Sequence, residues 1–155
     1  MKKLAVLSMI LCFPLFVNGQ SNNQVKQSFY SYFGYRPDVK WVQVNNYDEA
    51  IFTRDGKEIT AYYDSDGVLV GTTNIVPFAK VPMKGQQEIE KKYKDYSIGP
   101  VIFFNDNEYN ETDIELYGVH VGPDDNYFVE LSKGSDKIIV KVDPEGKVSF
   151  FTNLR

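Results

Sequence analysis

Apolar residues recur every three or four positions in two segments of the chain, which predicts two amphipathic helices. Residues 24–33 form the first, and Gly34 is expected to end it. Residues 86–96 form the second, whose opposite side is charged. The residues on the two apolar faces are Val25, Phe29, Tyr32 and Phe33, and Ile89, Tyr93 and Tyr96.

Elsewhere the pattern is that of short strands joined by tight turns. Asp55-Gly56 and Asp66-Gly67 each separate two apolar runs, and this dipeptide is typical of a hairpin turn. Antiparallel pairing is therefore expected. The predicted strands cover residues 40–45, 48–54, 57–63, 68–73, 99–104, 113–121, 127–132, 137–142 and 147–151.

The order of these elements is a helix followed by strands, repeated once. Residues 61–69 also parallel residues 140–148, although chance similarity of two hairpins is the alternative explanation. We therefore predict an α+β fold of two tandem units, each a helix on an antiparallel sheet, whose sheets can join with the helices on one face. The two pseudo-repeats span about residues 21–76 and 84–153.

The first residues are typical of a secretory signal. Lys2 and Lys3 precede the apolar stretch 4–17, and cleavage is expected before Gln20, so that residues 1–19 are removed. A membrane anchor is the alternative, but the stretch is shorter than the roughly 20 residues that a span needs. Because Cys12 lies in this segment, the mature chain has no thiol for disulfides, nucleophilic catalysis or metal binding. A periplasmic or secreted location is predicted.

Charge narrows the class of partner. The chain of 155 residues has a formal net charge of −4 and no cluster of Lys and Arg. A surface that follows a phosphate backbone needs such a cluster, so nucleic acid is not expected as a partner. No stable membrane span is expected once the signal is removed.

Residues capable of catalysis or metal binding are few. His120 is the only histidine, without a second imidazole or a thiolate to complete a metal site. Asp64-Ser65-Asp66-Gly67 begins like a calcium loop, but its glycine falls at position four and not six, so a hairpin turn is favoured over calcium. The remaining carboxylates cluster in polar loops. The sequence therefore predicts no enzyme, no metal and no cofactor.

The chain is rich in aromatic residues, with 11 Tyr and 11 Phe, and this surplus indicates where on the sheet a binding face would lie. Alternate strand residues face opposite sides of a sheet. We expect the helices to cover Ala61, Tyr63, Val101, Phe103, Val119, Val121, Val129, Leu131, Val140, Val142, Val148 and Phe150. The other parity then forms an apolar outer face, a candidate binding face made of Trp41, Tyr62, Phe104, His120, Phe128, Ile139 and Phe151. The alternatives are that this face packs within the chain, or that the parity of some strands is inverted.

Several stretches together resemble the PepSY-like family of exported bacterial proteins, which is related in fold to the β-lactamase inhibitor protein. The resemblance rests on Trp41 and on residues 47–52, 56–67, 78–82 and 89–98, and extends over nearly the whole mature chain. It implies a periplasmic or surface location, helices packed on antiparallel sheets and no established catalytic residues. Among the inhibitor relatives it also implies binding of an enzyme through a sheet face.

Two functions follow as expectations. The first is an exported, inhibitor-like binding module that docks an unknown envelope protein or peptide through its aromatic sheet face. The second is a non-catalytic structural or homeostasis protein of the envelope, whose aromatic residues serve packing or self-association.

Overall fold

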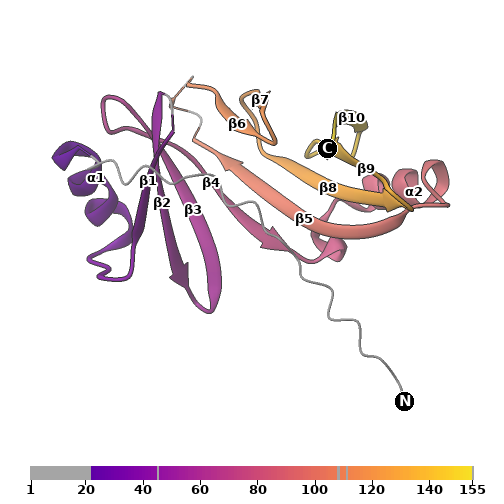
Figure 1. Cartoon of the computed structure of the whole chain (residues 1–155), viewed down its shortest axis with the longest axis horizontal. Coiled ribbons are helices and arrows are strands. Elements are labelled where there is room, and N and C mark those ends of the chain that lie inside the picture. Colours follow the sequence, from indigo (N-terminus) through magenta and orange to yellow (C-terminus); the bar gives the residue numbers. More distant parts are fainter. Residues whose placement is uncertain (1–21, 45, 108, 111, 155) are drawn as a thin grey trace, which may run out of the picture.

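The main element of the molecule is one continuous antiparallel sheet of eight strands, in the order β1-β2-β3-β4-β5-β8-β9-β10 (Figure 1). The structure, a computed structural model, describes residues 22–44, 46–107, 109–110 and 112–154. The sheet strands are β1 (Lys40–Val44), β2 (Tyr47–Arg54), β3 (Lys57–Asp64), β4 (Leu69–Val76), β5 (Ser97–Asp106), β8 (Asn126–Lys133), β9 (Asp136–Val142) and β10 (Val148–Asn153).

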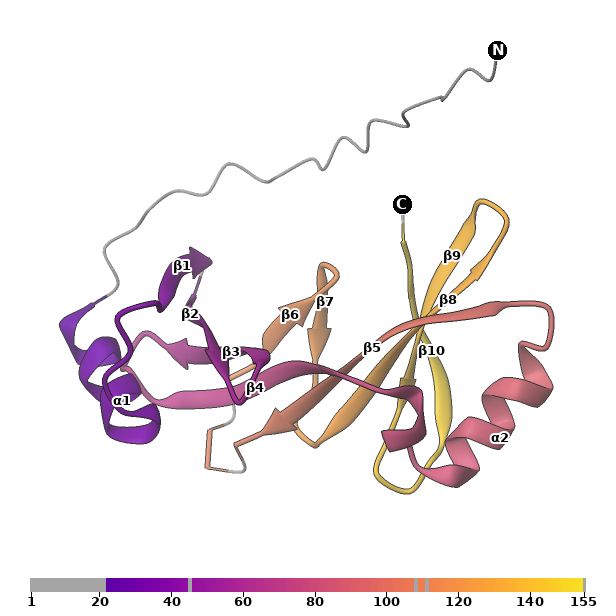
Figure 2. The ribbon, with the colours of Figure 1, turned by 90° about the horizontal axis from the view of Figure 1, so that it is seen from below.

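Two helices, α1 (Asn23–Phe33) and α2 (Met83–Lys92), lie near opposite ends of the sheet (Figures 1 and 2). The cap of α1 is Asn22, whose side chain accepts the backbone N–H of Gln24 at 3.2 Å, and Gly34 with φ 75° ends the helix. The short 3₁₀ helix η1 (Phe78–Lys80) precedes α2. Both predicted helices are confirmed, although α2 lies a few residues earlier than expected.

The helices cover the same face of the sheet, which we call the helix face. Under α1 the core is aromatic, and Phe29 is fully buried at its centre. Its ring centroid lies 5.3 Å from that of Trp41, 5.0 Å from Phe52 and 6.5 Å from Tyr63, all edge-on. Such tilted ring pairs add stabilisation beyond the area they bury.

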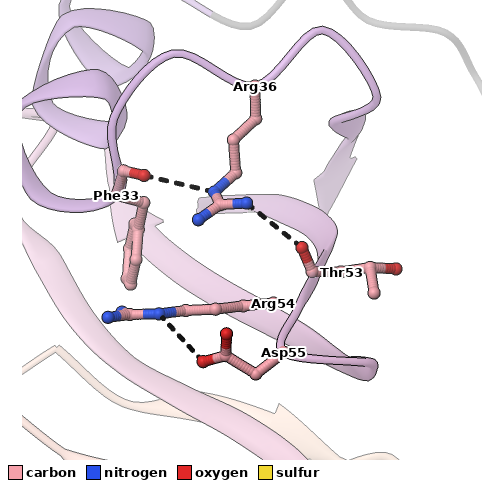
Figure 3. Close-up of polar contacts among 5 residues, drawn as sticks. All are labelled: Phe33, Arg36, Thr53, Arg54 and Asp55. Atoms are coloured by element: carbon pink, nitrogen blue, oxygen red, sulfur yellow. Dashed lines mark hydrogen bonds and ion pairs between the residues drawn. The ribbon is translucent and has the colours of Figure 1, made fainter.

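Arg36 fastens the segment after α1 to the end of β2 (Figure 3). Its Nε donates to the carbonyl of Phe33 at 3.1 Å, and its Nη1 donates to the carbonyl of Thr53 at 3.2 Å. The guanidinium also lies 5.4 Å from the centre of the Phe52 ring. The sequence pattern offered no signal for this contact, because it joins a loop to a strand end through backbone carbonyls.

Under α2 the core is aliphatic. Ile89 packs with the buried side chains Val101, Val129, Leu131, Ile138, Val140, Val142 and Val148. Gly85 permits this close contact, because a Cβ there would lie 2.5 Å from the Cγ1 of Val142. A glycine inside a helix costs about 1 kcal/mol relative to alanine, and here it allows α2 to approach β9.

Residues 113–121 do not form the single strand that the sequence predicted. They form a separate hairpin of β6 (Ile114–Leu116) and β7 (Val119–Val121), placed on the sheet face away from the helices (Figure 1). Tyr117 and Gly118 have φ of 55° and 73°, the positive values that a two-residue type I′ turn requires. Tyrosine rarely occupies such a position, so the turn was missed.

The sheet is unbroken across the predicted boundary between the two halves. β4 and β5 pair in register from Gly71 opposite Asp106 to Val76 opposite Val101. The α+β class and the continuity of the sheet are thus confirmed, while the division into pseudo-repeats stays a prediction. Residues 1–19 lie outside the part of the chain that the structure describes.

The contact between β4 and β5 depends on a glycine, and we expect Gly71→Ala to lower the free energy of unfolding by about 1–3 kcal/mol. A Cβ at Gly71 would lie 2.6 Å from Phe104 Cε2 and 2.7 Å from the carbonyl oxygen of Asn105. Urea denaturation measures the loss. Gly122→Ala is the matched control, since a Cβ there meets nothing within 4 Å. Equal stability of the two variants would contradict this close approach.

Candidate binding site on the hairpin face

The sheet face that carries the hairpin, which we call the hairpin face, has a hydrophobic core of its own. The hairpin contributes Ile114, Leu116 and Val121 to it. The sheet contributes Tyr47, Tyr62, Val70, Phe104, Phe128 and Ile139. The hairpin therefore forms an additional layer on the side of the sheet away from the helices.

The candidate binding face is covered over most of its area. Tyr62 is 5% exposed and Phe104 is 2% exposed, while Phe128 and Ile139 are fully buried. These four residues do share the face opposite the helices, as their parity predicted. The expectation of an open aromatic patch is nevertheless wrong for them, because the hairpin packs on them, as the alternative of packing within the chain had allowed.

The other three predicted residues lie apart from one another. Trp41 packs against Phe29 on the helix face, so its assigned parity is inverted. His120 is exposed on β7, with its Nε2 3.6 Å from a carboxylate oxygen of Glu115. Phe151 is half-buried on the hairpin face, 4.8 Å from the ring of Phe128. Participation of any of the seven side chains in binding stays a prediction.

Three residues that we expected the helices to cover also differ. Val119 and Val121 both lie on β7, which the turn at Tyr117-Gly118 carries onto the hairpin face, and Val121 packs in the core beneath the hairpin. Phe150 lies opposite Val140 and so has the predicted parity of the helix face, but it is 55% exposed on the edge strand β10 and the helices do not cover it. The register shifts only after Phe150, between Phe150 and Thr152, and a bulge of this kind changes the alternation of the following side chains by one residue.

A hollow beside the hairpin is the strongest candidate for a site. Its cavity volume is about 470 Å³, within the range of pockets that hold small ligands or single peptide side chains. It lies over β3, β4 and β5, and β6 forms one wall. The lining residues are Gly56, Lys57, Glu58, Thr60, Tyr62, Thr73, Asn74, Ile75, Ile102 and Leu116.

Apolar and polar groups are divided within the hollow. Ile75, 66% exposed, stands on β4 directly opposite Ile102 of β5, so their side chains lie on the same face. The hydroxyl of Tyr62 and the Oγ1 of Thr73 are hydrogen-bonded at 3.0 Å. An exposed isoleucine beside satisfied polar groups suits an apolar ligand group more than a charged one.

A second hollow, with a cavity volume of about 420 Å³, lies between the hairpin turn and the end of β10. The turn residues Tyr117, Gly118 and Val119 line it together with Thr152, Asn153 and Leu154. The hairpin thus contributes to two depressions of one face.

Burial changes the acidity of several groups around the first strands. It raises the pKa of the Tyr62 phenol strongly and that of the Tyr47 phenol less. It also raises the pKa of Glu49 and of Asp48, and for Asp48 the nearby Lys26 acts in the opposite direction. In a partly desolvated site the charged form of a carboxyl is disfavoured unless a cation lies near it.

The turn at residues 64–67 is a hairpin turn, as the sequence favoured. Asp64 Oδ1 accepts the backbone N–H groups of Asp66 and Val68, each at 2.9 Å, and its Oδ2 accepts Asn110 Nδ2 at 2.8 Å. These bonds already occupy both oxygens. Among the described residues, no group of three or more His, Cys, Asp or Glu side chains is arranged to hold a metal ion.

Several solved structures share the architecture. A DUF2874 family protein from Bacteroides uniformis superposes with a TM-score of 0.71 at 14% identity, covering 86% of this chain and 90% of that one. A protein from Bacteroides eggerthii, provisionally described as periplasmic, gives 0.69 at 14% identity, with 86% and 91% covered. A BLIP-like protein from Bacteroides fragilis gives 0.62 at 15% identity, with 86% and 89% covered.

The fold is BLIP-like. The predicted relation to the fold of the β-lactamase inhibitor protein is thereby confirmed. No family model matches the chain, and no curated protein matches it either. Among the described residues, no helix has the length and apolar character that crossing a membrane requires. At these identities the BLIP-like fold is shared, and function has to be argued from the site.

Proposed function

We propose that the chain is an exported, non-enzymatic binding module that takes an apolar segment of a protein or peptide into the hollow beside the hairpin. The observation that carries this proposal is the hollow itself, open to solvent and flanked by the exposed Ile75, beside the part of the face that the hairpin buries. A largely exposed isoleucine at the edge of such a hollow is the kind of side chain that a partner covers.

The BLIP-like neighbour and the one described as periplasmic support a binding role in the cell envelope. The first 19 residues, which have the basic start and the apolar stretch of a secretory signal, support export. The proposed site is smaller than the aromatic sheet face expected from the sequence, and it lies to one side of the residues predicted to form that face. The hairpin covers Phe104, Phe128 and Ile139 and leaves the side formed by β3, β4 and β5 accessible.

We expect Ile75→Asp to weaken binding at least about tenfold while leaving the fold intact, because a carboxylate would have to be desolvated in an apolar contact. The measurement is fluorescence anisotropy with pools of labelled apolar pentapeptides. Ile98→Asp is the matched control, because Ile98 is an exposed isoleucine that does not line the hollow. No binding by any pool, or equal loss in both variants, would contradict the proposed function.

Self-association is the second candidate, favoured by β10. This edge strand has no charged residue from Val148 to Asn153, and it exposes Phe150. Edge strands that lack charges can pair with another chain. Light scattering of the same samples separates the candidates: a concentration-dependent oligomer abolished by Phe150→Ser would support a structural role acting by self-association.

A further inference from the structure

Apolar and hydroxyl side chains line the hollow beside the hairpin in two separate rows. Ile75 of β4 stands directly opposite Ile102 of β5, and the two form an apolar row. Two residues away along β4, Thr73 stands directly opposite Thr60 of β3, and these two form a hydroxyl row. Residues two apart on a strand point to the same face of the sheet, as do residues opposed across a pair. Both rows therefore lie on the hairpin face, side by side.

Tyr62 brings a third hydroxyl to the hydroxyl row. Its phenol oxygen lies 3.0 Å from Thr73 Oγ1, and the two residues are only 5% and 7% exposed, so they form the floor of the hollow. A hydroxyl group donates one hydrogen bond and can accept two. The bond between Tyr62 and Thr73, the one that either hydroxyl makes within the described part of the chain, uses one of their two hydrogens. The pair can therefore still donate one hydrogen bond and accept others.

The hydroxyl row carries no charge. A threonine hydroxyl does not ionise, and burial raises the pKa of the Tyr62 phenol, which therefore keeps its proton. The charged residues of the lining, Lys57 and Glu58, are both exposed at the start of β3, where water screens them. Moving a charged group from water onto a neutral, buried floor has a high desolvation cost. The floor thus favours a neutral group that can form hydrogen bonds.

The spacing of the two rows fits one kind of side chain. Two residues along a strand span about 7 Å, which is close to the length of a phenol side chain. An aromatic ring placed on Ile75 and Ile102 would direct its para hydroxyl toward Thr60 and Thr73. A phenol both donates and accepts, as the hydroxyl row does, whereas an aliphatic side chain would remove water from these hydroxyls without replacing its hydrogen bonds.

We propose that the partner segment presents a tyrosine, whose ring lies on the apolar row and whose phenol forms hydrogen bonds with the hydroxyl row. This inference rests on the proposed function and specifies the chemistry of its partner. The apolar row supplies contact area for the ring, and the hydroxyl row distinguishes tyrosine from phenylalanine. A tyrosine side chain has only two torsion angles to fix on binding, which keeps its entropy cost low.

Three pools of labelled pentapeptides test this inference, each with mixed apolar residues around a central Tyr, Phe or Leu. They are titrated by fluorescence anisotropy against the protein as its host processes it. We expect the Tyr pool to bind about three- to tenfold tighter than the Phe pool, the gain typical of one neutral hydrogen bond. The Phe and Leu pools lack the hydroxyl and should bind with similar affinity.

The triple variant Thr60→Val/Tyr62→Phe/Thr73→Val removes the hydroxyl row and nearly preserves its shape. Because both partners of the buried hydrogen bond are replaced together, no hydroxyl is left unpaired, and the fold should be retained. We expect the Tyr pool to fall to the affinity of the Phe pool. Thr60→Val alone keeps the buried pair and should lower the preference for Tyr at least about twofold.

Thr152→Val is the matched control, since Thr152 lines the second hollow, and it should leave the preference for Tyr unchanged. A preference that survives in both the triple variant and Thr60→Val overturns the inference. A preference lost in Thr152→Val overturns it too, by placing the tyrosine in the second hollow. Equal binding of the Tyr and Phe pools also overturns it but leaves the proposed function standing. Absence of binding by every pool rejects both.

Discussion

Replacing Phe29 with alanine is expected to lower the free energy of unfolding by about 3–5 kcal/mol, the cost typical of removing a fully buried aromatic side chain. Phe29 and Val25 are the two buried residues through which α1 packs on the sheet, and Phe29 is the larger. Its ring contacts those of Trp41 on β1, Phe52 on β2 and Tyr63 on β3, so one truncation removes contacts to three strands. The cavity would lie at the centre of the cluster, where the rigid neighbouring rings can collapse only partly.

Chemical denaturation followed by tryptophan fluorescence is the suitable measurement, because Trp41 is the single tryptophan and lies in this cluster. Tyr32→Ala is the matched control: Tyr32 is on the same helix but 61% exposed, and we expect a change below about 0.5 kcal/mol. If Phe29→Ala were as mild as Tyr32→Ala, α1 would not be packed on the sheet as described.

Periodicity of the sequence was sufficient for most of the fold. The spacing of Val25 and Phe29 identified α1, and the Asp-Gly turns identified the β2–β3 and β3–β4 hairpins, because both signals are local and strong. Alternation also assigned Ala61 and Tyr63 to the helix side and Tyr62 to the other. Each of these inferences needs only residues within one element.

The candidate site depends on which distant segment of the chain covers the sheet face. The alternation of residues along one strand does not reveal such contacts. An apolar sheet face has the same pattern whether solvent, a partner or another segment of the chain covers it. The cover here is a hairpin of two three-residue strands turning at Tyr117-Gly118, too short to show a period of its own. Trp41 was misassigned for a second reason, since β1 is an edge strand whose parity has only one neighbour to fix it.

The hairpin decides whether the hairpin face is a core or an open surface, so its packing is the second large effect to measure. We expect Ile114→Ala to lower the free energy of unfolding by about 2–5 kcal/mol, because Ile114 is buried on β6 among the side chains of the sheet. His120→Ala, on β7 of the same hairpin, removes an exposed side chain and should cost less than about 0.5 kcal/mol.

The size of this effect also selects between the two views of the binding face. A loss in the expected range means that Phe104, Phe128 and Ile139 are core, and a partner then meets only the hollow beside the hairpin. A loss below about 1 kcal/mol, accompanied by binding of a fluorescent hydrophobic dye, would mean that the hairpin leaves the sheet in solution. The aromatic face would then be open, and the larger binding surface expected from the sequence would have to be reconsidered.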